Sequence, residues 1–200
     1  MIIIGLTGGI ASGKSAVAGF LAARGARVVD VDRLAHETYA PGTPGFAAVA
    51  GAFGPGIVAP DGSIDRRALG AIVFNDATQL KKLTDIVWPL TRQRLIEIRA
   101  KEQAAGTAVL VFEAAVLLEA GWRDLVDEVW LVRTPRDIAR ARLMTRNNLT
   151  AAEAETRLAA QPPDEERARQ SDVIIDNDAD LQRLEGRVET AWSLLQERAR

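Results

Sequence analysis

The sequence has no cysteine and a single histidine, His36. Disulfide bonds and thiolate metal sites are therefore excluded, and one histidine is too few for a histidine metal cluster. The sequence also lacks a large excess of either charge. Its formal net charge of −2 provides no field that would hold a nucleic acid or an anionic membrane. The opening residues MIII have no basic segment before them, so we expect neither a signal peptide nor a membrane span. These features favour a cytoplasmic protein that recognises its partners by local contacts.

The chain of 200 residues, 48% of them hydrophobic, is long enough for one domain that carries a smaller insertion. Short β-branched runs alternate with helical patterns, which is typical of a parallel sheet with helices on both faces. The expected strands are 2–6, 27–31, 107–112, 127–132 and 172–176. The sequence thus predicts an α/β fold with a five-stranded parallel sheet flanked by helices.

Residues 42–104 interrupt this alternation because they contain no convincing buried strand. Asp65 is placed to cap a helix, and Pro89 restarts or kinks a later one. We expect 42–104 to be a helical insertion, with 1–41 and 105–200 forming the core.

Two helices are expected after the arginine-rich helix that carries Arg142 and Arg146. Thr150 and Glu153 form a T-x-x-E capping box that opens a short helix, and Pro162-Pro163 ends it. This helix belongs to a predicted lid at about 142–165. Residues 179–198 have the apolar spacing of an amphipathic closing helix.

Gly8 to Ser15 follow the pattern G-x-x-x-x-G-K-[ST], directly after a predicted strand and before a predicted helix. Glycines let the loop wrap its N–H groups around phosphates, Lys14 reaches the β- and γ-phosphates, and the Ser15 hydroxyl is suited to bind Mg²⁺. This context predicts a P-loop NTPase fold that binds a nucleoside triphosphate with Mg²⁺. The expected phosphate-binding residues are Gly9, Ile10, Ala11, Ser12, Gly13, Lys14, Ser15 and Ala16.

The alternatives for this loop are a plain tight connection and a dinucleotide-binding turn, but the G-x-G-x-x-G of the latter is absent. The N-K-x-D and D-x-x-G motifs usual in guanine-nucleotide switches are absent too. ATP is therefore the expected nucleotide.

Charged residues of both signs are candidates for catalysis. Asp30 and Asp32 end the second predicted strand, where two extended residues point to one side about 6–7 Å apart. A carboxylate there can take the proton of an attacking hydroxyl, or Asp32 can cap the next helix. Arg142 and Arg146, four residues apart, share one helix face and can close over ATP, or they form ordinary surface ion pairs.

In order and spacing, these motifs resemble the dephospho-coenzyme A kinases, which transfer the γ-phosphate of ATP to the ribose 3′-hydroxyl of dephospho-CoA in the last step of coenzyme A biosynthesis. The similarity covers nearly the whole chain. It runs through GLTGGIASGKS, VVDVDRLAH, DGSIDRRAL, IVWPL, EAAVLLEAGW, RLMTR, AAQ and SDVIIDN.

The resemblance implies a role for each matching residue. Asp32 would be the general base with Asp30 assisting, Asn177 would lie near the adenine, and the helical insertion would bind the acceptor. The implied catalytic residues are Asp32, Lys14 and Arg142; Arg142, Arg146 and Asn177 join the loop in binding ATP; and Asp30, Asp32, Arg66, Trp88 and Glu113 would contact the acceptor.

Two positions depart from the family pattern. Trp88-Pro89 stands where His-Pro is usual, and EAAVLLE begins with Glu113 instead of aspartate. The second change, with AGW after it, resembles the kinase domain of the bifunctional coenzyme A synthases. The Trp88 ring either fills the core or packs on the pantetheine arm. Two other functions stay open: a P-loop kinase for another small hydroxyl acceptor, such as a nucleoside or nucleoside monophosphate, and a non-catalytic ATP-binding module.

Overall fold

The computed structural model describes residues 1–198 and divides the chain into two compact units. One unit comprises Met1–Asp30 and the chain from Glu102 onward, and the other is Val31–Lys101. The first holds the sheet and the second is mainly helical.

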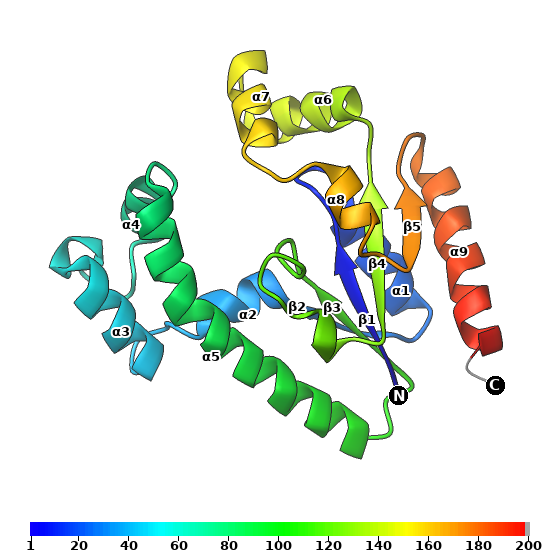
Figure 1. Ribbon diagram of the computed structural model, residues 1–200, viewed down its shortest axis with the longest axis horizontal. Coiled ribbons are helices and arrows are strands. Elements are labelled where there is room, and N and C mark those ends of the chain that lie inside the picture. The colour runs from blue at the N-terminus through cyan, green and yellow to red at the C-terminus, as the bar shows by residue number, and fades with distance from the viewer. Residues whose placement is uncertain (199–200) are drawn as a thin grey trace. The chain divides into compact units, whose positions relative to one another are not determined.

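The sheet of the first unit is parallel and has five strands, as the sequence predicts (Figure 1). Its order is β2-β3-β1-β4-β5. The central strands β1, β3 and β4 are almost wholly buried, which explains their runs of apolar residues. The strands are β1 Ile2–Thr7, β2 Arg27–Asp30, β3 Val109–Glu113, β4 Glu128–Arg133 and β5 Val173–Asp176.

Helices of the first unit cover the sheet and extend beyond the carboxyl ends of its strands (Figure 1). Helix α1 (Lys14–Ala23) packs on α9 (Leu181–Arg198), and both contribute to a core that includes Leu21, Trp130 and Trp192. The helix predicted directly after the glycine loop and the predicted closing helix 179–198 are thus confirmed. The remaining elements are the 3-10 turn η2 Arg123–Leu125 and the helices α6 Arg136–Asn147, α7 Ala151–Ala159 and α8 Asp164–Ala168.

The capping box at the start of α7 is confirmed. The Glu153 N–H donates to Thr150 Oγ1 at 3.3 Å, and the Thr150 N–H donates to Glu153 Oε2 at 2.8 Å. This reciprocal pair satisfies two N–H groups and fixes the point where α7 begins.

The second unit has its own core, which includes Val49, Ile57, Leu69 and Val87. Its elements are α2 Val31–Glu37, α3 Pro44–Phe53, the 3-10 turn η1 Pro55–Ile57, α4 Arg66–Val73 and most of α5 Ala77–Ala104. Its described residues contain no strand, only an isolated bridge between Val58 and Ile64, so the segment 42–104 is mainly helical as expected. The compact unit itself begins earlier than that segment, at Val31, and ends at Lys101.

Of two local features expected in this helical unit, the Asp65 cap is confirmed, but Pro89 does not restart a helix. Asp65 caps α4 by accepting the N–H groups of Arg67 and Ala68 at 2.9 and 3.1 Å. Pro89 lies inside α5, which runs on as one helix. Within residues 1–198, no helix is long and apolar enough to cross a membrane.

Candidate active site

The loop between β1 and α1 has the backbone form of an anion cradle. Ala11 and Gly13 have positive φ values of 59° and 96°, and the Ser12 N–H donates to the Gly9 carbonyl at 3.2 Å. Within the described chain, the N–H groups of Ala11, Gly13, Lys14 and Ser15 make no hydrogen bond to another protein group. They lie at the N-terminus of α1, whose partial positive charge also favours an anion.

A cavity of about 590 Å³ brings this loop together with α6. Its lining includes Lys14 and Ser15 from the loop and Arg142 and Arg146 from α6, as the sequence suggested. Of the predicted phosphate-binding residues, Gly9, Ala11, Ser12, Gly13, Lys14, Ser15 and Ala16 line it and Ile10 does not. The volume suits a small-molecule ligand, and the cations suit a phosphorylated one.

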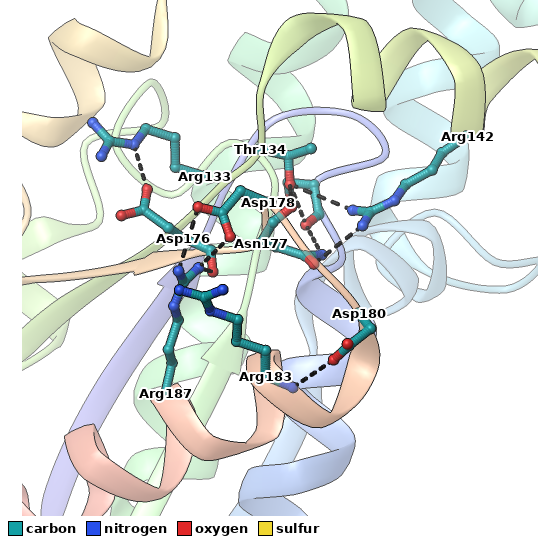
Figure 2. Close-up of polar contacts among 10 residues, drawn as sticks. Arg133, Thr134, Arg142, Asp176, Asn177, Asp178, Asp180, Arg183 and Arg187 are labelled. Atoms are coloured by element: carbon teal, nitrogen blue, oxygen red, sulfur yellow. Dashed lines mark hydrogen bonds and ion pairs between the residues drawn. The ribbon is translucent and has the colours of Figure 1, made fainter.

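Asn177 connects the loop to Arg142 (Figure 2). Its Nδ2 donates to the Ser12 carbonyl at 2.7 Å, and its Oδ1 accepts from Arg142 Nη2 at 3.1 Å. Thr134 Oγ1 strengthens the junction by donating to the same Ser12 carbonyl at 2.9 Å. The buried Asn177 amide therefore holds both the loop and an arginine of the cavity, a role that the sequence did not reveal.

Ion pairs around the end of β5 hold the turn that carries Asn177 (Figure 2). Arg133 Nε donates to Asp176 Oδ1 at 2.8 Å, and this bond raises the pKa of Arg133. Arg187 Nη1 donates to Asp178 Oδ1 at 2.8 Å, and this bond lowers the pKa of Asp178. The sequence signal for the first pair is only that both residues end strands that prove to be neighbours in register.

Ser15 and Glu113 are in direct contact. Ser15 Oγ donates to Glu113 Oε1 at 2.9 Å, and Glu113 ends β3, in register with Leu6 of β1 and Asp30 of β2. Hydroxyl and carboxylate oxygens are the hard ligands that Mg²⁺ prefers. The described residues contain no group of three or more acidic, histidine or cysteine side chains that could hold a metal, so phosphates and water would have to complete such a site.

Asp32, the second of the two candidate acids, lies in a helix. We expected Asp30 and Asp32 to share one extended segment, and this is wrong, because β2 ends at Asp30 and α2 begins at Val31. Asp32 is exposed in the first turn of α2, where a carboxylate is favoured by the helix dipole.

Two further residues predicted to bind the acceptor, Arg66 and Trp88, belong to the helical unit. Arg66 is exposed at the first position of α4, and Trp88 is half-buried in α5. Arg66 also acts on Tyr39, which sequence reasoning missed: burial raises the Tyr39 pKa and the Arg66 charge opposes that rise. The Tyr39 hydroxyl is hydrogen-bonded to His36 Nδ1.

Sequence reasoning also missed a group of residues behind the phosphate loop. The Ile10 N–H donates to Gln161 Oε1 at 2.7 Å, and the buried Arg167 binds Glu119. Gln161 lies in the AAQ segment and Glu119 in EAAVLLEAGW, so both belong to matching motifs, but neither carries a recognisable local pattern.

The glycine loop, with its free amides, lies at the carboxyl edge of a parallel sheet ordered 2-3-1-4-5 and shares a cavity with two arginines of α6. This combination defines a P-loop kinase. The dephospho-CoA kinase family model matches residues 2–183. The chain belongs to the dephospho-CoA kinase family.

A curated relative supports this assignment, and two solved structures share the fold. The dephospho-CoA kinase of Geobacter sulfurreducens is 49% identical over 194 residues, which cover 96% of this chain and 98% of the relative. The crystal structure of TT1252 from Thermus thermophilus is similar with a TM-score of 0.81 and 33% identity, covering 97% of both chains. The dephospho-CoA kinase of Campylobacter jejuni shares the fold, with a TM-score of 0.74, 24% identity and coverage of 99% of this chain and 98% of that one.

Proposed function

We propose that this chain transfers the γ-phosphate of ATP to the ribose 3′-hydroxyl of dephospho-CoA, giving coenzyme A and ADP. The observation that carries the proposal is the cavity in which the free loop amides, Lys14, Arg142 and Arg146 converge, in a chain whose family match spans residues 2–183. In phosphoryl transfer of this kind, positioning and electrostatic stabilisation do most of the work.

The loop and the arginines act on ATP. The N–H groups of Ala11, Gly13, Lys14 and Ser15 bind phosphate oxygens, and the Lys14 ammonium binds the β- and γ-phosphates. Arg142 and Arg146 stabilise the charge on the phosphoryl group during transfer. Asn177 keeps Arg142 beside the loop through its two hydrogen bonds.

Ser15 and Glu113 fit a Mg²⁺ ion that is bound together with ATP. The Ser15 hydroxyl would be its protein ligand, and Glu113 would orient that hydroxyl and bind water around the ion. When bound, the ion would supply positive charge that neutralises part of the negative charge on the phosphates of ATP.

Asp32 is the proposed general base. Its carboxylate accepts the proton of the 3′-hydroxyl as that oxygen forms a bond to the γ-phosphorus and the bond from phosphorus to ADP breaks. Asp30 assists at the end of β2, two residues earlier in the chain. Arg66, exposed at the start of α4, binds acceptor phosphate, and Trp88 contacts the acceptor from α5, in a helical unit that we assign to acceptor binding.

Acceptor profiling tests this function. ADP release from MgATP is measured with dephospho-CoA, adenosine, AMP and pantetheine, and the product is examined by mass spectrometry. We expect turnover selective for dephospho-CoA and a product heavier by one phosphoryl group. Turnover selective for another acceptor would keep the kinase and discard this substrate, and ATP binding without turnover would indicate a non-catalytic module.

A further inference from the structure

One amide of the phosphate loop, that of Ile10, is held by a side chain from a distant part of the chain. The Ile10 N–H donates to Oε1 of Gln161 at 2.7 Å, a contact between residues 151 positions apart. Ser12 donates within the loop to Gly9, so two amides of this turn are bound inside the protein. The neighbouring amides of Ala11 and Gly13, in contrast, have no protein partner in the described chain.

The turn that these two hydrogen bonds close contains an unfavourable backbone. Ala11 has a φ of 59°, in the left-handed region that a residue with a β-carbon adopts only at a cost in energy. Such a conformation persists when surrounding contacts determine it. Gln161 supplies such a contact at the adjacent residue, Ile10.

The segment that carries Gln161 also packs directly on Gly9. A β-carbon on Gly9 would lie 3.3 Å from Gln161 Oε1, 3.6 Å from Asp164 Oδ1 and 3.7 Å from Arg167 Nη1. The close approach leaves little room for a larger residue at position 9. Gln161 is therefore fitted to the shape of the loop as well as to its amide.

A buried arginine fixes the position of this segment. Arg167 is 3% exposed, and its Nε and Nη2 donate to Glu119 Oε1 at 3.0 and 2.8 Å. Its Nη1 lies 3.4 Å from the Pro162 carbonyl and 3.6 Å from Asp164 Oδ1. A buried charge bound on several sides is costly to displace. Arg167 thus ties the chain just after Gln161 to the loop that follows β3.

We propose that Gln161 is a positioning residue of the kinase reaction, which holds the Ile10 amide so that the remaining loop amides face the phosphates of ATP. Arg167 and Glu119 in turn hold Gln161 in place. The proposal rests on the proposed function only in its assumption that the loop binds ATP, and not on the identity of the acceptor.

The decisive variant is Gln161→Met, which keeps the volume and removes the hydrogen-bond acceptor. ATP affinity is measured by titration calorimetry without an acceptor, and hydrogen exchange of the Ile10 amide is followed by NMR in the nucleotide-free protein. We expect ATP binding to weaken roughly tenfold, the scale of one hydrogen bond lost from a shielded donor, and the Ile10 amide to exchange faster. The KM for dephospho-CoA should stay near its wild-type value, and the melting temperature should fall by only a few degrees, the cost of one hydrogen bond.

Two further variants complete the test. Gln170→Met is the matched control, because Gln170 is exposed and its side-chain amide donates a long hydrogen bond of 3.4 Å to the Glu166 carbonyl, within its own turn of chain. Gln161→Glu retains an acceptor for Ile10, so slow exchange of that amide should return even though the added charge opposes ATP.

Three results would overturn the proposal: wild-type ATP affinity in Gln161→Met, fast Ile10 exchange in the wild type, or an equal loss of affinity in Gln170→Met. Wild-type protein that binds ATP without phosphorylating dephospho-CoA would instead refute the proposed function. The comparison of ATP affinities would still decide the role of Gln161.

Discussion

The side-chain nitrogen of Asn177 occupies the space that a β-carbon on Gly13 would need. Gly13 also has a φ of 96°, which disfavours any residue with a β-carbon. The second glycine of the loop motif is thus required by its own backbone and by a side chain from beyond β5. This close approach lets Asn177 reach the Ser12 carbonyl.

Gly13→Ala should lower the affinity for ATP by about 10²-fold or more, because backbone strain and a steric clash with Asn177 both act within the loop. Titration calorimetry with MgATP measures the effect. Gly19→Ala is the control: Gly19 lies in α1 with no atom near its β-carbon position, so alanine there should stabilise the protein by about 0.5–1 kcal/mol and leave ATP binding intact. Comparable ATP affinity in the two variants would refute this account of Gly13.

Asn177→Asp should separate the two hydrogen bonds of Asn177. A carboxylate still accepts from Arg142, but it faces the Ser12 carbonyl without a proton to donate. We expect a loss of about 1–3 kcal/mol in stability and weaker ATP binding, since two acceptors then meet in a buried place. Denaturant unfolding and calorimetry measure the two effects. In the control, Asn75→Asp, the exposed amide donates to the Ala71 carbonyl, and both quantities should change little.

Asp32→Asn tests the general base. The amide cannot take a proton, so turnover with dephospho-CoA should fall by about 10²-fold or more while the ATP dissociation constant stays close to that of the wild type. Steady-state kinetics and calorimetry provide the comparison. Asp85→Asn, on the exposed face of α5, is the matched control and should retain full turnover. Near-normal turnover of Asp32→Asn would remove Asp32 from the mechanism.

Glu113→Ala should change the dependence on Mg²⁺. Without the Glu113 carboxylate, the Ser15 hydroxyl loses the acceptor that orients it, so we expect the Mg²⁺ concentration for half-maximal activity to rise about 5-fold or more. Removing Mg²⁺ with a chelator should abolish turnover in both proteins. Glu97→Ala, at an exposed site on α5, should leave the Mg²⁺ dependence unchanged, and the same curve in all three proteins would contradict the proposed site.

The sequence predicted the features that depend on local pattern. The five strands, α1, α9 and the Thr150 capping box were all visible in runs of fewer than 25 residues, because strand burial, helix amphipathicity and capping act over short distances. The phosphate loop was recognised for the same reason, since its glycines, Lys14 and Ser15 lie together in the chain.

Contacts between distant residues could not be predicted in this way. Gln161 and Ile10, like Asn177 and Ser12, are more than 150 positions apart, and a single glutamine or asparagine after a helix or strand has no periodicity that marks its partner. The early start of α2 was missed because the β-branched run 27–31 includes Val31, which forms the first residue of a helix and is buried there. The catalytic and binding roles assigned to the candidate site residues, Asp32, Arg66 and Trp88 among them, remain predictions.

The pKa of Asp164, the first residue of α8, predicts how the stability of the protein depends on pH. Burial raises this pKa and Arg167 opposes the rise. Because the pKa of Asp164 is raised in the folded state, the protonated carboxyl group stabilises the fold. This contribution to stability is complete below the pKa of the unfolded state, about 4, and is lost as pH rises through the pKa of the folded state. Asp164→Asn should therefore be more stable than the wild type at pH 7 and lose this advantage below about pH 4, as measured by denaturant unfolding.

Asp178→Asn should show the opposite sign. The hydrogen bond from Arg187 lowers the pKa of Asp178, so its contribution is present at neutral pH and is lost as pH falls through the folded-state value. The variant should be less stable than the wild type at pH 7, with a difference that shrinks in acid. If both variants shift stability in the same direction at pH 7, burial does not govern the ionisation of Asp164, and the charge of Arg167 outweighs the desolvation of its partner.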